Sequence, residues 1–454
     1  MLCFSLKTFP IHHKTIFLRV DFNVPLEKGK VLDNTKIKAA LPTIQFLLQH
    51  GCKIILATHL GRPQEKHAAK YTEKSASSAP LSIAPLAQEL QRLLPHYKIK
   101  NLDDCIGKEV AAAISKGKAG DLFFLENLRF YKEEEENDFT FAHALASLAE
   151  IYVNDAFGVS HRKHASIHAI TQFRPAVPGF LMEKEVTMLS KALQPERPAV
   201  WVIGGAKLNK VELIQQALQK ADKVLIGGAL AFAFLRAKGI PMGMSKVDHA
   251  SVVQAKKLLK KRAAKKLVLP RDFSVAEKFS PYAKTRIVPY NGIGTAEIAL
   301  DIGPETIKLF THHLQNARTI FWNGPLGYFE WSKFARGTKE IGQAIGKATS
   351  KEVPALSICG GGETGEAVRK FHLEHHFTHV STGGGTALAF LAGEKLPALR
   401  ALEEGGCWHD NTHWDTHKHR GECAVVTDCP EWCDRCKALA LAEPLLAKVE
   451  EHRD

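Results

Sequence analysis

Long hydrophobic runs are absent from this chain of 454 residues. The longest, residues 224–235, falls short of the about 20 residues that span a bilayer, and Gly227 and Gly228 interrupt it. The N-terminus also lacks the apolar core of a secretory signal peptide. We therefore expect a cytoplasmic protein that has no membrane partner.

Nucleic-acid-binding motifs are also missing: we find no zinc finger, no RNP-type aromatic motif and no basic heptad region. The formal net charge is nevertheless +13, which a nucleic acid, a membrane surface or a polyanionic small molecule could each explain. The basic stretch 256–266 has helical spacing and is most simply a solvated helix face. We expect no nucleic-acid partner, and a nucleic-acid-binding protein stays a third hypothesis that would need a contiguous basic surface.

The order of apolar runs indicates two α/β domains, the default for a chain longer than one hydrophobic core supports. Short apolar runs alternate with helix-period stretches, which predicts parallel sheets covered on both faces. A helical stretch at residues 179–194 separates the two sets. The expected strands are residues 15–20, 53–57, 121–125, 151–153, 200–203, 223–226, 266–269, 319–322, 355–359 and 378–381. The predicted fold is two doubly wound parallel-sheet (Rossmann-like) domains joined by a hinge helix.

Polar motifs end four predicted strands of the first half. They are DFN (21–23), HLGRP (59–63), ENLRF (126–130) and NDAFG (154–158), the last followed by HRKH (161–164). Ligands of open parallel sheets bind beyond the carboxyl ends of the strands, so we expect Arg62, Arg129 and Arg162 to converge there with histidines. One such arginine alone would more often be an ordinary surface residue. Together, because guanidinium groups match phosphate and carboxylate, they predict a site for a small anion that carries both groups.

Glycine clusters end the strands of the second half. They are GGAK (204–207), GG (227–228), NGPLG (323–327), GGGET (360–364) and STGGG (381–385). Glycines let a backbone approach a ligand closely, and a helix N-terminus favours phosphate, so the pattern predicts a phosphate cradle. No GxxxxGK[ST] run exists, which excludes a P-loop kinase. The GxGxxG match at 360–365 lacks the acidic residue about 20 positions later that a dinucleotide site would want, which disfavours a dehydrogenase.

These motifs, with RVDFNVP (19–25) and WNGPLGYFE (322–330), resemble those of the phosphoglycerate kinase family in order and nearly in spacing. The resemblance covers roughly residues 10–402. It implies a phosphoglycerate-binding domain at 1–178, a hinge helix at 179–194, a nucleotide-binding domain at 195–385 and a returning segment at 386–402.

The resemblance also implies an activity. Such a phosphotransferase passes the 1-phosphoryl group of 1,3-bisphosphoglycerate to Mg-ADP, giving 3-phosphoglycerate and ATP, with a carboxyl group as acceptor in the reverse direction. It implies Mg²⁺ as cofactor, ATP/ADP as co-substrate, a monomer, and domain closure about residues 179–194.

Site residues carry over from the family motif by motif. The expected substrate-binding residues are Asp21, Phe22, Asn23, Lys36, His59, Leu60, Gly61, Arg62, Arg129 and Arg162. The expected nucleotide-binding residues are Gly204, Gly205, Lys207, Lys210, Gly227, Gly228, Asn323, Pro325, Glu330, Gly360, Gly361, Gly362, Glu363 and Thr364. The expected catalytic residues are Lys36, Lys207, Lys210, Gly361 and Gly384, and Glu363 is the expected Mg²⁺ ligand.

Three departures from the family fall at the chemistry. Lys36 replaces an arginine that serves as the transition-state cation, and so loses the bidentate fork. Glu363 replaces the usual metal-associated aspartate. The stretch from Lys207 to Lys210 is one residue shorter than usual. Besides these three, Ala299 stands where a nucleotide-site glycine is common. An alternative is therefore a catalytically impaired or regulatory homologue that binds both ligands without efficient transfer.

Residues 403–454 form a cysteine- and histidine-rich extension beyond the family's usual end. Four cysteines earlier in the chain are scattered singly, as in a reducing compartment, whereas five crowd this extension. A zinc site is one interpretation, and an unstructured appendage or a reading-frame artefact is the other. The candidate zinc ligands are Cys423, Cys429, Cys433 and Cys436.

Overall fold

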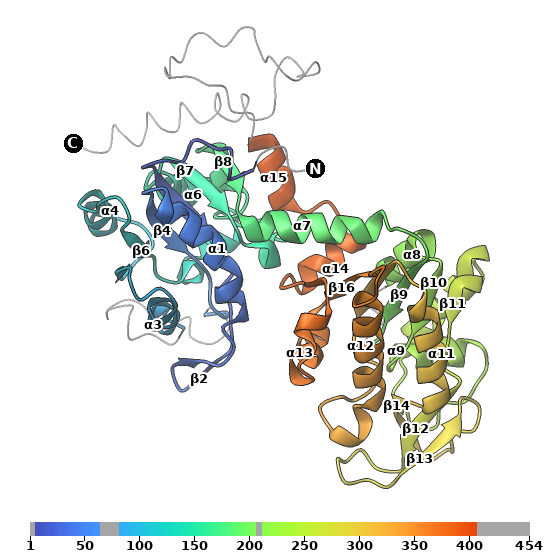
Figure 1. Cartoon of the computed structure of the whole chain (residues 1–454). Helices are drawn as coiled ribbons and strands as arrows, with labels where there is room; N and C mark the ends of the chain where they lie inside the picture. The colour runs from blue at the N-terminus through green and yellow to red at the C-terminus, as the bar shows by residue number, and fades with distance from the viewer. Residues whose placement is uncertain (1–4, 64–80, 206–210, 406–454) are drawn as a thin grey trace. The chain divides into compact units, whose positions relative to one another are not determined.

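The computed structural model describes residues 5–63, 81–205 and 211–405. Contacts divide the chain into two compact units (Figure 1), each with its own hydrophobic core. Unit 1 holds the described residues up to Ala156, then Arg162–Glu183 and the chain from Pro397. Unit 2 holds Phe157–His161 and Lys184–Leu396.

Unit 1 is built on a six-stranded sheet with the order β5-β6-β4-β1-β7-β8, in which every pairing is parallel. Four of the five residues in β1 and in β4 are buried, which is the pattern of a sheet covered on both faces. The strands are β1 (Thr15–Arg19), β4 (Lys53–Ala57), β5 (Ile99–Asn101), β6 (Leu122–Phe124), β7 (Ile151–Asn154) and β8 (Ala176–Pro178). The helices are α1 (Thr35–Gln49), α3 (Ala84–Leu93), α4 (Lys108–Ser115), α5 (Lys132–Glu135) and α6 (Phe139–Ala146). The short hairpin β2 (Leu26–Glu27) and β3 (Lys30–Val31) precedes α1.

Unit 2 repeats the scheme with a second parallel sheet of order β11-β10-β9-β15-β16-β17. Its strands are β9 (Ala199–Ile203), β10 (Lys223–Ile226), β11 (Leu267–Val268), β15 (Thr319–Asn323), β16 (Leu356–Gly360) and β17 (His379–Val380). Its helices are α8 (Val211–Lys220), α9 (Leu230–Ala237), α10 (His249–Leu259), α11 (Pro304–Gln315), α12 (Arg336–Thr349), α13 (Gly362–Lys370) and α14 (Gly385–Leu391). The prediction of two doubly wound parallel sheets is confirmed.

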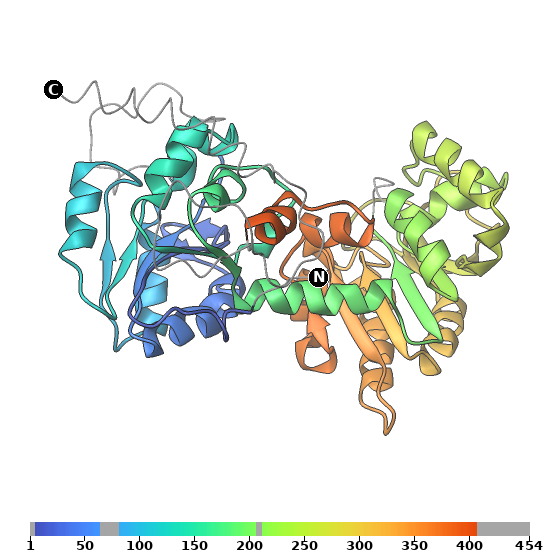
Figure 2. The same cartoon turned by 90° about the horizontal axis from the view of Figure 1, so that it is seen from above.

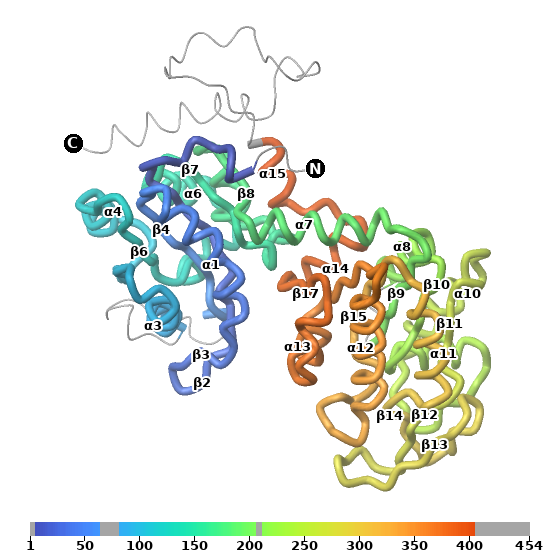
Figure 3. The backbone as a smooth tube through the Cα atoms, in the orientation of Figure 1, coloured from blue at the N-terminus to red at the C-terminus, as the bar shows by residue number. Residues whose placement is uncertain are grey.

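One sheet of unit 2 was not predicted from the sequence. The antiparallel strands β12 (Asp272–Ala276), β13 (Thr285–Pro289) and β14 (Ile298–Ile302) pair in the order β13-β12-β14. They lie together at one end of the unit (Figure 3). Four of the five residues of β13 are exposed, so this edge strand lacks the apolar run by which the other strands were found.

Helix α7 (Phe180–Leu193) is one unbroken helix (Figure 2) and lies within the stretch expected for the hinge. Its first turn is held by Asp155, whose Oδ1 accepts hydrogen bonds from the backbone N–H groups of Leu181 (2.9 Å) and Met182 (3.2 Å). A carboxylate suits the positive end of a helix. Burial nevertheless raises the pKa of Asp155 to about 6. The role of α7 as a hinge stays a prediction.

The chain returns to unit 1 through α15 (Pro397–Gly405), which packs against β8 and the 3₁₀ helix Ala169–Gln172. The segment expected at 386–402 is thus divided, because α14 and the residues up to Leu396 belong to unit 2. The first residues of the expected extension form the last turn of α15. Within the described residues, the structure has no helix of the length and apolarity needed to cross a membrane.

Candidate functional site

The polar motifs of unit 1 follow strands that are neighbours in the sheet. β1 pairs with β4 on one side and with β7 on the other, so their carboxyl ends lie at one edge. This is also where the strand order reverses, because the chain proceeds from β1 to β4 and later returns to the far side of β1 with β7. Such a switch point is the usual ligand site of an open parallel sheet.

Hydrogen bonds tie several predicted substrate-binding residues together. The Nζ of Lys36, from the first turn of α1, lies 2.8 Å from Oδ2 of Asp21. The side-chain oxygen of Asn23 accepts a hydrogen bond of 3.0 Å from the N–H of Gly61. The carbonyl of Gly61 in turn accepts one of 2.6 Å from Nη1 of Arg129. The motifs after β1, β4 and β6 therefore form one connected cluster, and the substrate-binding role of these residues stays a prediction.

Arg129 is the most constrained cation of this cluster. Its side chain is buried, its Nε lies 3.1 Å from Oε1 of Glu135, and its buried Nη2 has no hydrogen-bond partner in the described structure. Burial lowers the pKa of Arg129, and repulsion from Arg162, Arg19 and Arg62 lowers it further, while Glu135 acts in the opposite direction. A bound anion would satisfy Nη2 and relieve this repulsion.

His59 lies in the same cationic surroundings. The side chain is buried, and its Nδ1 lies 3.2 Å from Nη2 of Arg19. Burial lowers the pKa of His59 well below its usual value, and the positive charges of Arg19, Arg129, Lys36 and Arg162 add to that effect. The imidazole is therefore neutral at physiological pH and acts as a hydrogen-bonding group.

Other predicted substrate-binding residues differ in what they offer a ligand. The side chains of Phe22 and Leu60 are buried in the core of unit 1, and their backbone N–H groups already donate to Thr58 and Asn127. Arg62 is exposed and Arg162 is half-buried. Their charges reach Arg129, which indicates that all three arginines act on one region.

In unit 2, the glycines after β9 and β10 pack against neighbouring backbone. A Cβ on Gly204 would lie 2.2 Å from the carbonyl oxygen of Pro325, and one on Gly228 would lie 2.7 Å from that same atom. The N–H of Gly205 donates a 2.8 Å hydrogen bond to this oxygen. A Cβ on Gly227 would meet the side chain of Leu326 at 2.3 Å. Glycine is needed here for close packing of the loops, and a nucleotide-binding role for these residues stays a prediction.

The glycines at the start of α13 and α14 are different, because a Cβ on Gly362, Gly384 or Gly385 would meet nothing within 4 Å. The left-handed backbone of Gly361 (φ 98°) and Gly384 (φ 52°) starts these two helices. These two helix starts therefore have open space at the Cβ positions of their glycines, and a helix N-terminus favours an anion.

Asn323 and Thr364 connect the ends of β15 and β16. The Asn323 side-chain Nδ2 donates a 2.6 Å hydrogen bond to the carbonyl of Gly360, and the hydroxyl of Thr364 donates one of 2.9 Å to the same oxygen. That hydroxyl accepts a hydrogen bond of 2.6 Å from the N–H of Gly324. The Oδ1 of Asn323 is buried and has no hydrogen-bond partner in the described structure. A buried acceptor of this kind is expected to bind a donor from a ligand or from water.

The remaining predicted nucleotide-site residues lie on the surface or outside the description. Glu363, in the first turn of α13, and Glu330 are both exposed. Lys370, at the end of α13, donates hydrogen bonds to the carbonyls of Phe329 (3.0 Å) and Glu330 (2.8 Å). The predicted catalytic residues Lys207 and Lys210 lie outside the described residues, as do Cys423, Cys429, Cys433 and Cys436.

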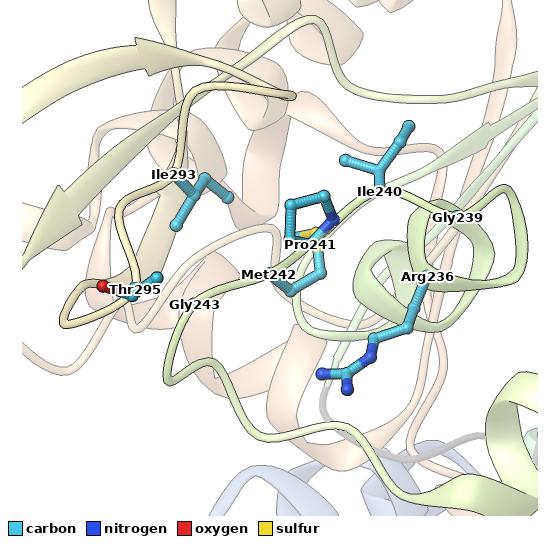
Figure 4. A pocket seen from close by; sticks show the side chains of 8 residues that line it. All are labelled: Arg236, Gly239, Ile240, Pro241, Met242, Gly243, Ile293 and Thr295. Atoms are coloured by element: carbon cyan, nitrogen blue, oxygen red, sulfur yellow. The ribbon is translucent and has the colours of Figure 1, made fainter.

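A pocket of about 460 Å³ in unit 2 shares no residue with the predicted site (Figure 4). It lies between the loop after α9 and the loop before β14, and Arg236, Met242 and Ile293 are among the residues that line it. The nucleotide-binding role of the glycine-rich turns stays a prediction.

Comparison with known proteins identifies the family. The family model described as "Phosphoglycerate kinase" matches residues 6–394. The chain belongs to the phosphoglycerate kinase family. A phosphoglycerate kinase from Moorella thermoacetica is 45% identical over 404 residues, which are 88% of this chain and 99% of that protein. One from Aquifex aeolicus is 43% identical over 406 residues, covering 88% of this chain and 98% of that one.

Solved phosphoglycerate kinases share the fold. The one from Coxiella burnetii has a TM-score of 0.77 at 34% identity, and the match covers 88% of this chain and 99% of that chain. The one from Pyrococcus horikoshii OT3 has a TM-score of 0.75 at 33% identity, with coverage of 88% and 98%. The predictions of a phosphoglycerate kinase and of an enzyme of the phosphotransferase class are confirmed, and nothing in the comparisons supports an impaired or regulatory homologue.

The sequence did not predict a buried hydrogen-bond network next to the cluster of unit 1. Arg19 and Glu134 are both fully buried, and Ser166 connects them. Arg19 begins the motif RVDFNVP, and no role was predicted for it. A charged residue at the end of an apolar strand was the available signal, since burial of an arginine requires partners.

Proposed function

We propose that the cluster of unit 1 holds the phosphoglycerate and that the open glycine turns of unit 2 hold the nucleotide. The reaction would be reversible transfer of the 1-phosphoryl group of 1,3-bisphosphoglycerate to ADP, as in glycolysis and gluconeogenesis. The observation that carries the first assignment is the buried, unpartnered Nη2 of Arg129 amid other cations. Family membership supports the reaction, and the buried cations support the class of ligand.

The proposed roles in unit 1 follow from charge and position. His59, Arg62, Arg129 and Arg162 hold the negative groups of the triose, while Asp21 and Asn23 accept from or orient its polar groups. Lys36 is the proposed cation nearest to the transferring group, and its salt bridge with Asp21 keeps its ammonium at the cluster. Transfer of a phosphoryl group needs positioning and charge neutralisation rather than a side-chain nucleophile.

The proposed roles in unit 2 rest on the open turns. The N–H groups at Gly362 and at Gly384 and Gly385 would receive phosphate oxygens, with Asn323, Gly361 and Thr364 behind them. Glu330 is proposed for the ribose, and its backbone is fixed by Lys370. Lys207 and Lys210 are proposed, from the family motif alone, as cations at the transferring group.

The described residues fit a Mg²⁺ ion that the nucleotide itself largely holds. Within the described part of the chain, no group of three or more metal-ligating side chains could hold a metal. Mg²⁺ in nucleotide sites is bound by one or two carboxylates together with substrate phosphates, and Glu363 supplies one exposed carboxylate at the turn. The ion would neutralise phosphate charge. The cytoplasmic location and the monomeric state stay predictions.

The test is a coupled assay with purified protein, ATP and 3-phosphoglycerate. We expect Mg²⁺-dependent formation of ADP, and substitution Arg129→Met is expected to raise the KM for 3-phosphoglycerate by at least about tenfold, since a buried charge-assisted contact is lost. The KM for ATP should not change. Saturable binding of both ligands without turnover would instead support the impaired homologue.

A further inference from the structure

A series of fully buried polar side chains, linked by hydrogen bonds, contacts His59. Arg19, the last residue of β1, is completely excluded from solvent. Its Nε donates a 2.8 Å hydrogen bond to the hydroxyl of Ser166, and its Nη1 donates to the carbonyl of Val20. Its Nη2 lies 3.2 Å from Nδ1 of His59. One guanidinium therefore contacts the backbone, a hydroxyl and the imidazole at once.

Glu134 fixes the other end of this chain. Its Oε1 accepts a 2.6 Å hydrogen bond from the Ser166 hydroxyl, and its Oε2 accepts one of 2.9 Å from the Ser166 N–H. The same Oε1 lies 3.9 Å from Nη2 of Arg19 and 3.8 Å from Nδ1 of His164. Because the hydroxyl donates to the carboxylate, its oxygen is free to accept from Arg19. The direction of every bond in the chain is thus determined.

We propose that Arg19 is a positioning residue that fixes the tautomer of His59, and that Ser166 and Glu134 hold Arg19 in place to do so. A guanidinium has donors only, so the nitrogen that faces it must be the acceptor. Nδ1 of His59 therefore carries no proton, and the single proton of the neutral ring is on Nε2. The imidazole presents one N–H donor to an anion at the cluster, without needing to be charged.

The other groups around His59 favour the same state. The charges that face it are Arg19 from β1, Lys36 from α1, Arg129 from the turn after β6, and Arg162. All four are cations, so each of them would repel a second proton on the ring. The carboxylate of Glu134 accepts from Ser166 and lies 3.9 Å from Nη2 of Arg19. Because the pKa of His59 is lowered, the ring stays neutral to a more acidic pH than a free histidine does.

The consequence for binding rests on the proposed function, in which His59 contacts the phosphoglycerate. The neutral Nε2–H of His59 adds no positive charge beside the arginines. The ring also does not need to take up a proton when the anion binds. If Nδ1 carried the proton instead, Nε2 would present a lone pair to the anion and repel it. The tautomer thus decides whether His59 contributes to affinity or opposes it.

The tautomer can be measured in the free protein by long-range ¹H–¹⁵N correlation spectra of ¹⁵N-histidine-labelled full chain, with His59 assigned from the spectrum of His59→Gln. We expect a protonated Nε2 and an unprotonated Nδ1 from about pH 5 to pH 8, the range over which a free histidine would change state. A protonated Nδ1, or an imidazolium at pH 7, would overturn the proposal. This measurement needs no substrate, so it stands apart from the proposed function.

The variant Ser166→Ala tests the support of Arg19. We expect the Nδ1-protonated form to become populated and the KM for 3-phosphoglycerate to rise roughly tenfold, the effect of about one charge-assisted hydrogen bond, with kcat and the KM for ATP little changed. The matched control is Thr171→Val, which removes another buried hydroxyl of unit 1 that bonds only the carbonyl of His168 (2.9 Å). An unchanged tautomer in Ser166→Ala, or equal effects of the two variants on the spectrum and on KM, would contradict the proposal.

Discussion

Oε2 of Glu185 lies 3.0 Å from Nε2 of His379, and both side chains are buried within unit 2. Glu185 belongs to α7 and His379 to β17, so this contact joins the helix to the last strand of the sheet. The other oxygen of Glu185 accepts hydrogen bonds from the N–H (2.7 Å) and the hydroxyl (2.9 Å) of Thr382. The carboxylate therefore also anchors the turn that leads to Gly384.

Glu185→Gln is expected to lower the free energy of unfolding by about 1–3 kcal/mol, because buried charge-assisted hydrogen bonds are lost. Burial alone would raise the pKa of Glu185, but hydrogen bonds from His379, Ser381 and Thr382 bring it below its usual 4.5. A lowered pKa stabilises the fold above about pH 4.5, and that contribution disappears as the pH falls through the folded-state pKa.

Urea unfolding of both proteins at pH 7 and pH 4 checks this. The exposed Glu212→Gln in α8 is the control, with an expected effect within about 0.5 kcal/mol. A difference between wild type and Glu185→Gln that does not shrink at pH 4 would refute the assignment.

Lys36→Arg is expected to raise kcat by roughly tenfold, since a guanidinium restores a planar fork at the proposed transition-state cation. The control is Lys38→Arg, an exposed position on the same helix, which should leave kcat unchanged. Steady-state rates at saturating ATP and 3-phosphoglycerate decide. Unchanged or lower activity of Lys36→Arg would show that lysine is no handicap here.

Asp301 makes the free energy of unfolding depend on pH in the opposite direction to Glu185. Burial raises its pKa to about 8, although the N–H groups of Gly337 (2.8 Å) and Ile302 (2.9 Å) donate to it. Between its ordinary value of 3.8 and about 8, the unfolded chain is ionised at this position and the folded chain is not, so this group makes the fold less stable as the pH rises.

Asp301→Asn removes that dependence. It also removes one acceptor, so we expect the variant to be less stable than wild type at pH 5 and the gap to narrow by about 1 kcal/mol or more at pH 8. Chemical unfolding at both pH values measures the gap. A gap that is the same at pH 5 and at pH 8 would mean that Asp301 titrates in its ordinary range.

Two glycines that the sequence placed in one nucleotide site should respond differently to alanine. Gly204→Ala brings a Cβ to 2.2 Å from a carbonyl oxygen and is expected to destabilise the fold by about 2 kcal/mol or more. Gly362→Ala meets nothing within 4 Å and improves helix propensity, so stability should be unchanged or higher while the KM for ATP rises. Thermal unfolding and the coupled assay measure both effects. A Gly362→Ala enzyme with a normal KM for ATP would exclude this turn from nucleotide binding.

Removal of residues 406–454 is expected to leave kcat and both KM values unchanged, because the family match ends at residue 394 and α15 is retained. Zinc analysis of the full chain and of the shortened chain tests the proposed zinc ligands. About one zinc per full chain, lost on truncation, would support a metal site, and no zinc in either would refute it. Loss of activity on truncation would show that the extension has a role in catalysis.

Sequence patterns found the parallel strands because those strands are buried on both faces. The run IFLR of β1 and the run IILA of β4 have no polar alternation, and Gly or polar turns bound them. The same criterion failed for β13, whose Arg286 and Ile287 are both exposed. An edge strand of a small antiparallel sheet carries no continuous apolar run, so its signal was too weak.

The sequence likewise predicted some residues of the candidate site and not others. Arg129 was identified because an arginine-bearing motif ends a predicted strand, and Lys36 was identified from the resemblance to the family. The contact between Arg19 and Ser166 was not, since the two residues are 147 positions apart and neither forms a motif with the other. Likewise, the sequence could not separate Gly204, which packs against backbone, from Gly362, which faces open space. That difference depends on whether another loop packs against the glycine in the folded protein.

The return of α15 to unit 1 has a consequence during synthesis on the ribosome. Every other described residue of unit 1 is encoded before Lys184, whereas α15 begins at Pro397. At about 5–20 residues per second, translation of the intervening unit takes roughly 10–40 s. For that time, β8 and the 3₁₀ helix Ala169–Gln172 lack the helix that packs against them. The first unit to emerge is thus the last to be completed, and its nascent form exposes a surface to chaperones.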